Sequence, residues 1–105
     1  MNFSGFSPAL SMISIACKGG NIKSGGLSIE NTIKSGKAFL IIIANDASFN
    51  TSKKILDMCS YRNVPAVRYS TKEMLGRCTG KEQRSALAVT DENLAKAIIE
   101  KMSDS

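Results

Sequence analysis

The 105-residue sequence contains no histidine, so it lacks the commonest general base and the commonest metal ligand of proteins. Its three cysteines, Cys17, Cys59 and Cys78, lie far apart without C-x-x-C spacing, which predicts neither a disulfide framework nor a zinc site. We expect buried, reduced thiols, because free cysteine packs as a small hydrophobic residue. An enzyme would need Cys59 or Cys78 to be activated by a nearby cation, since the sequence offers no nucleophile–base pair. We therefore predict no catalytic residues, no metal and no cofactor.

Long apolar segments are also missing. The longest apolar run, residues 38–44, is far shorter than the roughly 20 residues that span a bilayer. No Lys or Arg precedes Lys18, so the N-terminal region lacks the basic start of a signal peptide. These features predict a cytoplasmic protein with no membrane partner. The length leaves room for one domain, residues 1–105, which we expect to be monomeric.

The formal net charge is +5, and the basic residues are unevenly distributed. Residues 18–37 contain four lysines against one acid, and residues 53–84 contain eight basic residues against three acids. Acids outnumber bases only in residues 91–105, apart from the single Asp46. A basic surface of this kind suits a polyanionic partner such as nucleic acid. The alternative is that the charge serves only to keep a small domain dispersed in water.

The run from Phe39 to Ala44 is apolar without alternation, which predicts a strand buried on both faces. Such a strand needs helices above and below it. Shorter strand-like segments at residues 21–23, 66–69 and 86–89 alternate with helical patterns along the chain. The sequence therefore predicts an α/β fold, a three-layer α/β/α sandwich on a small sheet, but it does not give the strand order.

Polar capping residues predict where the helices begin. Ser7 before Pro8 is typical of a helix start, and Ser70 with Glu73 has capping-box spacing. By the same signals, we expect the remaining caps to be Asn50 or Thr51 for the third helix and Thr90 for the last helix.

Three segments are candidate functional sites. Lys23-Ser24-Gly25-Gly26 leads into a helix whose first N–H groups can attract phosphate. The charged loop 80–85 enters a strand at Ala86-Leu87 and can support an extruded base. Asn45 to Ser48 follow the central strand, where open α/β sheets often carry function. The alternatives are a flexible helix start, a solvated loop before an edge strand, and an ordinary Asx turn.

Five stretches, taken in order, resemble one family. They are Gly20-Asn21-Ile22-Lys23-Ser24-Gly25, Ile33-Lys34-Ser35-Gly36-Lys37-Ala38, Ala44-Asn45-Asp46-Ala47-Ser48, Cys59-Ser60-Tyr61-Arg62-Asn63-Val64-Pro65 and Leu75-Gly76-Arg77-Cys78-Thr79-Gly80-Lys81. From about Ser11 to about Lys101, the chain resembles the superfamily of ribosomal proteins L7Ae and L30e, and within it the small bacterial YlxQ-like proteins. This resemblance implies a small mixed sheet and binding of structured RNA of the kink-turn kind, in rRNA or mRNA, with the ribosome as a further candidate partner.

The resemblance also implies which residues contact RNA. In kink-turn-binding members, the start of the second helix enters the groove beside sheared G·A pairs, and the loop before the last strand shelters a flipped-out nucleotide. Mapped onto this sequence, the expected RNA-binding residues are Lys23, Ser24, Gly25, Gly26, Leu27, Ser28, Asn31, Lys34, Lys72, Arg84, Ser85, Ala86 and Leu87.

Leu27 and Asn31 depart from the family pattern. RNA-binding members carry Asn-Glu or Glu-Glu around the first position and Lys at the second. Leu27 cannot accept a hydrogen bond from a guanine amino group, and a lost bidentate base contact is worth about 1–3 kcal/mol. Two functions therefore remain open: kink-turn recognition, or a ribosome-associated or protein-interaction module that keeps the fold without the RNA code.

Overall fold

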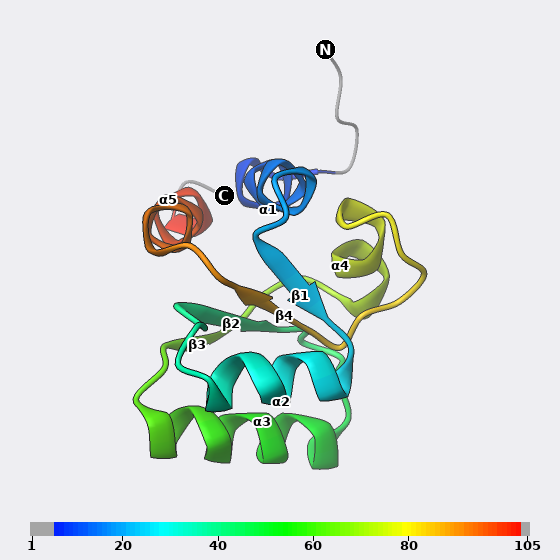
Figure 1. Cartoon of the computed structure of the whole chain (residues 1–105). Coiled ribbons are helices and arrows are strands. Elements are labelled where there is room, and N and C mark those ends of the chain that lie inside the picture. Colours follow the sequence, from blue (N-terminus) through cyan, green and yellow to red (C-terminus); the bar gives the residue numbers. More distant parts are fainter. Residues whose placement is uncertain (1–5, 104–105) are drawn as a thin grey trace.

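The computed structural model describes residues 6–103, which form five helices around a four-stranded sheet (Figure 1). In chain order, the elements are α1 (Pro8–Lys18), β1 (Ile22–Ser24), α2 (Gly26–Lys34), β2 (Leu40–Ile43), α3 (Phe49–Arg62), β3 (Ala66–Arg68), α4 (Lys72–Cys78), β4 (Ala86–Val89) and α5 (Glu92–Ser103). Each strand predicted from the sequence is present, within two residues of its expected bounds.

The strand order in the sheet is β1-β4-β2-β3. β2 runs parallel to β3 and antiparallel to β4, with Ile41 opposite both Ala66 and Ala88. The sheet is therefore small and mixed, as the resemblance implied. Every residue of β2 and β4 is buried, so the prediction of a strand covered on both faces is confirmed for β2. β4 is an interior strand, which corrects the alternative of an edge strand after loop 80–85.

Helices cover both faces of the sheet, as the sequence predicted (Figure 1). α1, α4 and α5 pack on one face against Leu40 and Ile42, and α2 and α3 pack on the other face against Ile41 and Ile43. The side-chain alternation of β2 thus divides one apolar run between two cores, because successive residues of a strand point to opposite faces. Within residues 6–103, no helix has the length and apolar composition needed to cross a membrane.

The predicted cap of α1 is confirmed, because the backbone N–H of Leu10 donates to Ser7 Oγ at 3.3 Å. The predicted cap of α4 is wrong by one residue. Ser70 has a φ of +65°, which is outside the extended region that an N-cap requires, and Thr71 caps the helix instead by accepting from the N–H of Met74.

Two other helices also begin at a residue the sequence did not favour. α3 is capped by Ser48, which accepts from the N–H of Thr51 at 3.2 Å, so Asn50 and Thr51 lie inside its first turn. α5 is capped by Asp91, whose Oδ1 accepts from the N–H of Leu94 at 2.9 Å. In both cases several polar residues compete, and backbone geometry decides between them.

Candidate functional site

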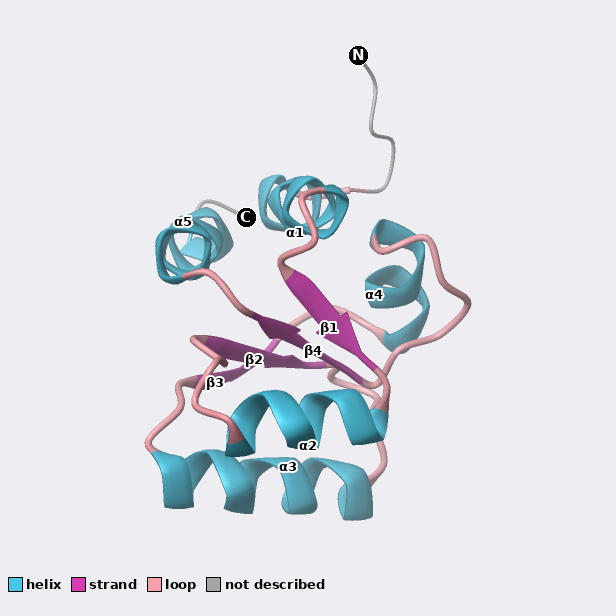
Figure 2. Ribbon diagram, viewed as in Figure 1, coloured by secondary structure: helices cyan, strands magenta, loops and turns pink. Residues whose placement is uncertain are grey.

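The structure brings together two of the predicted segments, the start of α2 and the loop before β4. Arg84 Nε donates to Ser24 Oγ at 3.1 Å across a sequence separation of 60 residues. In Figure 2, the loop from α4 to β4 passes beside the end of β1, where α2 begins. A hollow of about 300 Å³ lies between them, and it is lined by Gly25, Gly26, Ile29, Thr51, Ile55, Gln83, Arg84, Ser85 and Ala86.

Helix α4 holds this loop in place through backbone contacts. The N–H of Arg84 donates to Lys72 O at 3.0 Å, and the N–H of Lys81 donates to Gly76 O at 2.8 Å. A Cβ on Gly76 would lie only 1.9 Å from Glu82 O, so only glycine lets the loop approach the helix this closely. The loop is therefore fixed on the body of the protein before any ligand arrives.

The third candidate segment, residues 45–48, has a structural role here. Asp46 Oδ1 accepts from the N–H of Lys72 at 2.8 Å, and the N–H of Asn45 donates to Ser70 O at 2.8 Å. These bonds tie the end of β2 to the start of α4. They also place Lys72 directly beside the Arg84 loop, although its side chain is only half-exposed.

The end of the layer where α2 and α3 begin is electropositive for two reasons. No side chain of the described residues caps α2, because Gly25 occupies its N-cap with a φ of +93°, and neither helix has an acid in its first turn. Both helices begin beside the same hollow, since Gly26 and Thr51 line it together. The positive ends of two helix dipoles and the Arg84 guanidinium therefore face a shared hollow, an arrangement that attracts phosphate.

Three predicted residues of α2 lie on or near this end. Leu27 is 74% exposed, Asn31 is exposed and Ser28 is half-buried. The Thr32 hydroxyl donates to the backbone carbonyl of Ser28 at 2.7 Å, and this bond does not involve the Ser28 hydroxyl, which can still bond a ligand. The start of α2 thus presents one apolar and two polar side chains to solvent.

Three other predicted residues do not join the hollow. Lys34 lies at the far end of α2, about 12 Å from Gly26 at 1.5 Å per residue. Lys23 lines a different hollow with Lys37, near the end of α2. Leu87 is fully buried in the core, so its side chain cannot contact RNA, and that part of the prediction is wrong.

The structure adds four residues to the predicted RNA-binding set, namely Ile29, Thr51, Ile55 and Gln83, of which only Gln83 lies in a candidate segment, loop 80–85. Thr51 and Ile55 are four residues apart and so lie on one face of α3. The sequence predicts Thr51 as one of two alternative helix caps and gives no local signal that places Ile55 at a site. What the sequence lacked was the information that this face of α3 lies opposite loop 83–85.

The cysteines do not form a reactive site. Cys59 and Cys78 are buried, as predicted, whereas Cys17 is only partly buried and its thiol donates to Thr79 O. Burial raises the pKa of the Cys59 thiol, and burial together with the nearby Cys17 raises the pKa of Cys78 to about 11. Both shifts favour the unreactive thiol over the thiolate. Within residues 6–103, no three His, Cys, Asp or Glu side chains are grouped to hold a metal.

Comparisons with known proteins identify the family that the chain matches. A model of the ribosomal protein L7Ae/L30e/S12e/Gadd45 family matches residues 9–99. The chain is 35% identical over 88 residues to RNA-binding protein YlxQ of Bacillus subtilis (strain 168), covering 84% of this chain and 88% of that protein. It is 31% identical over 96 residues to RNA-binding protein YlxQ of Enterococcus faecium, covering 91% and 92%.

Two solved structures share the fold. A protein with unknown function from Bacillus halodurans C has a TM-score of 0.89 at 26% identity, covering 93% of this chain and 99% of that one. The Giardia lamblia 15.5kD RNA binding protein has a TM-score of 0.77 at 23% identity, covering 90% of this chain and 82% of that one. At such low identity, the second likeness shows the fold alone.

Proposed function

The chain belongs to the ribosomal protein L7Ae/L30e/S12e/Gadd45 family, as its sequence stretches suggested, and on this premise we propose that it is a non-catalytic protein that binds structured, kink-turn-like RNA. Two relatives that match most of its length carry the name RNA-binding protein. We further propose that it acts in the cytoplasm as a monomer, where rRNA and mRNA supply such structures.

The observation that carries this proposal is the hollow shared by the start of α2 and the Arg84 loop. The uncapped N–H groups of Gly26 and Leu27 hold a phosphate, which the absence of acid in the first turn favours. Arg84, fixed by its hydrogen bond to Ser24, lies at the rim, where its charge meets the RNA backbone. The hollow itself takes an unstacked base, with Ile29 and Ile55 as its apolar lining.

Leu27 and Asn31 set the expected specificity. This chain lacks the charged side chains that RNA-binding members carry at these two positions, so only Ser28 and Asn31 contact the guanine edges. Each lost bidentate contact lowers the binding free energy by about 1–3 kcal/mol. We therefore propose that shape and backbone contacts supply most of the affinity, with weaker reading of the G·A pairs than a Glu–Lys pair would give.

Binding to a kink-turn RNA, compared with the same RNA lacking its G·A pairs, tests this function at two salt concentrations. Tighter binding to the intact kink-turn at both salt concentrations is the expected result. Equal, steeply salt-dependent binding to both RNAs would contradict the proposal, because it would leave only counterion-driven contact. A plain duplex of equal length controls for charge.

A second candidate function is favoured by the apolar exposure at the same end of the molecule. Leu27 and Phe49 are 74% and 78% exposed, and they begin the two helices that flank the hollow. Exposed large apolar residues of this kind can anchor a protein partner, including a ribosomal one. In this reading, the chain keeps the fold but has given up the kink-turn code.

Leu27→Glu combined with Asn31→Lys separates the two candidates. If the wild-type protein does not distinguish the kink-turn from the RNA lacking G·A pairs and the double variant does, the protein-interaction function is favoured. If the wild-type protein already binds the kink-turn tightly, that function is rejected. Asn31→Lys alone is the matched control, because it adds one positive charge without removing the exposed Leu27.

A further inference from the structure

A second basic and aromatic surface lies at the opposite end of the α2–α3 layer, where both helices end. Three adjoining hollows share residues there. Gly36 and Phe39 line both the first and the third, and Arg62 lines both the first and the second. We name this continuous surface the C-terminal band. It is defined by Lys23, Lys34, Lys37, Phe39, Tyr61 and Arg62.

The cations of the C-terminal band are poorly neutralised. Among residues 6–103, Lys23, Lys37 and Arg62 have no carboxylate within 4.0 Å. Lys34 shares Glu30 with Lys54, and Lys54 is the closer partner, at 2.7 Å against 3.8 Å. Lys34 and Arg62 lie in the last turns of α2 and α3, where a positive charge complements the helix dipole. Lys23 and Lys37 lie outside the helices, so the helix dipoles do not account for their positive charge at this surface. Glu92 also lines one of these hollows, but its ion pair is with Lys96 at 3.8 Å and not with a cation of the band. The band therefore keeps positive charge for an anionic ligand.

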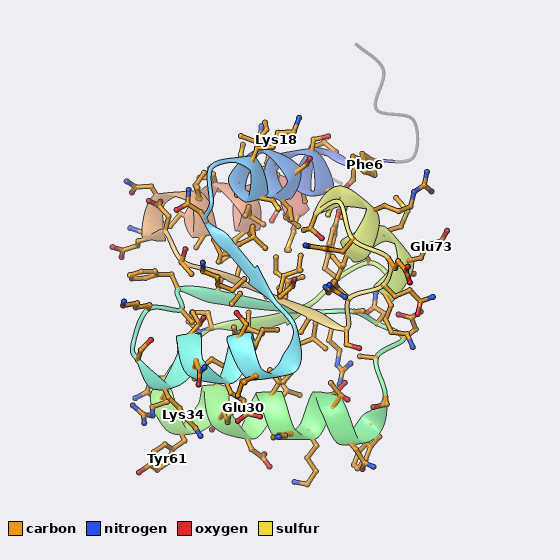
Figure 3. The ribbon with its side chains drawn as sticks, turned by 45° about the vertical axis from the view of Figure 1, so that its right-hand side comes forward. Phe6, Lys18, Glu30, Lys34, Tyr61 and Glu73 are labelled. Atoms are coloured by element: carbon orange, nitrogen blue, oxygen red, sulfur yellow. The ribbon has the colours of Figure 1, made fainter. Side chains whose placement is uncertain are left out.

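The same band carries exposed aromatic rings. Tyr61 is 83% exposed and Phe39 is 39% exposed. Figure 3 shows Tyr61 and Lys34 at the same end of the α2–α3 layer. Between the two helices there lies a mainly apolar hollow of about 270 Å³, lined by Ile33, Lys34, Asp57, Met58, Tyr61 and Arg62. Its one acid, Asp57, is paired with Lys53 at 3.2 Å. The Arg62 guanidinium lies 5.8 Å from the Tyr61 ring centroid.

We propose that the C-terminal band binds single-stranded RNA that flanks the structured element. Cations spaced along a groove with interleaved aromatic rings are what non-sequence-specific single-strand binders use, the cations for phosphates and the rings for stacked bases. The inference rests on the proposed function, because it assigns a second contact to the same RNA. The two surfaces are separated by the length of α3, 14 residues or about 20 Å, so an unpaired extension of a few nucleotides can reach both.

The test compares two RNAs. One is a blunt kink-turn RNA, and the other is the same RNA with an oligouridine tail of roughly ten nucleotides, within the usual site size for single-strand binding. The tail is expected to tighten binding about tenfold. Tyr61→Ala should remove most of this gain and leave affinity for the blunt RNA unchanged, whereas Tyr61→Phe should retain it, because the ring is kept.

Charge variants test the cations of the band separately. Lys37→Gln with Arg62→Gln should lower the magnitude of the log–log salt slope for the tailed RNA by about 1.4, since each single-strand phosphate contact contributes about 0.7. Lys18→Gln with Arg77→Gln is the matched control. It likewise removes one lysine and one arginine, from α1 and α4 on the opposite face of the sheet (Figure 1), and should leave the gain from the tail unchanged.

A spectroscopic readout does not depend on affinity for the kink-turn. The chain has no Trp and only two Tyr, so base stacking on Tyr61 should quench its tyrosine fluorescence. Tyr69→Phe isolates the Tyr61 signal. If the blunt RNA binds but the tail adds no affinity, this inference fails while the proposed function stands. If the blunt RNA does not bind, the proposed function fails, and absence of Tyr61 quenching by oligouridine alone would overturn the inference as well.

Discussion

The two ends of the α2–α3 layer differ in how their surfaces are held. Where the helices begin, the surface is fixed by contacts from distant segments: Arg84 to Ser24, Arg84 to Lys72, and Lys72 to Asp46. Where they end, one such contact is present, from Arg62 Nη1 to Lys34 O at 3.1 Å, and the rest of the surface consists of long exposed side chains such as Tyr61 and Lys37. A prearranged surface loses little freedom on binding, whereas long side chains must be ordered.

This difference suggests that the two ends bind different parts of an RNA. The end where α2 and α3 begin is suited to a ligand of defined shape, because its hollow, its backbone donors and Arg84 hold fixed positions. The C-terminal band, where both helices end, is suited to a flexible RNA strand, because its side chains can adapt to bases and phosphates in more than one register. Substitutions at one end should therefore change shape recognition, and substitutions at the other should change tolerance for unpaired RNA.

The largest expected effect comes from Gly76→Ala. Alanine normally stabilises a helix interior, but here its Cβ would lie 1.9 Å from Glu82 O, so either α4 or the loop must move. Overpacking of this kind costs about 3 kcal/mol. We expect a lower free energy of unfolding in urea and loss of kink-turn binding in whatever protein remains folded. The end where α2 and α3 begin would then lose its prearranged surface.

Gly26→Ala is the matched stability control for Gly76→Ala. A Cβ on Gly26 meets nothing within 4 Å, and the residue lies at the first position of α2 with no positive φ. Its free energy of unfolding should stay within about 1 kcal/mol of the wild type. Equal stability for both variants would show that the loop does not depend on close approach at Gly76.

A smaller effect is expected from separating the charge of Arg84 from its position. Arg84→Ala removes both and should weaken kink-turn binding about tenfold, as loss of a charge-assisted hydrogen bond does. Ser24→Ala keeps the charge but removes the 3.1 Å bond that orients it, and should cost about threefold. Titrations with the intact kink-turn measure both. Identical losses would mean that orientation alone matters, and no loss for either would remove Arg84 from the interface.

Local patterns predicted the fold well. An unbroken apolar run predicted β2, and apolar spacing, with capping residues for every helix except α2, predicted the helices, because these signals lie within a few residues of one another. The errors arose where several polar residues competed for one cap. At α4, the left-handed backbone of Ser70 leaves the cap to Thr71. Ser70 O also accepts from the N–H of Asn45, a contact between distant segments that no local pattern contains.

The candidate site was predicted only in part, for a related reason. Arg84 and Gly26 could be singled out from the sequence, whereas Thr51 and Ile55 join the hollow only because three separate segments meet there. Leu87 shows the opposite error. It follows the loop directly in sequence, but strand alternation turns its side chain into the core, opposite to the direction of Ala86.

A modest stabilisation is expected from Ser52→Ala, close to where α3 begins. Ser52 is 2% exposed, and its hydroxyl has no hydrogen-bond partner among residues 6–103. Burying an unsatisfied hydroxyl costs about 1 kcal/mol or more, and alanine also has the higher helix propensity. The variant should unfold at higher urea concentration with unchanged RNA binding. Destabilisation would mean that the hydroxyl has a partner in solution, such as a buried water.

The last effect is absent at neutral pH and concerns the helix on which the Arg84 loop rests. The pKa of Cys78 rises from 9.0 to about 11 on folding, chiefly through burial, so between these values the folded protein holds a proton that the unfolded chain has released. Stability should therefore be complete below pH 9 and fall as pH rises toward 11. Cys78→Ala lowers stability at neutral pH by leaving a small cavity, but it removes this alkaline decline.

Thermal unfolding of both proteins at several pH values measures the difference between their stabilities, which separates the contribution of Cys78 from other alkaline titrations. A constant difference from pH 8 to 11 would show that Cys78 ionises as freely in the folded protein as in the unfolded chain, and that α4 packs more loosely under the loop than the structure shows.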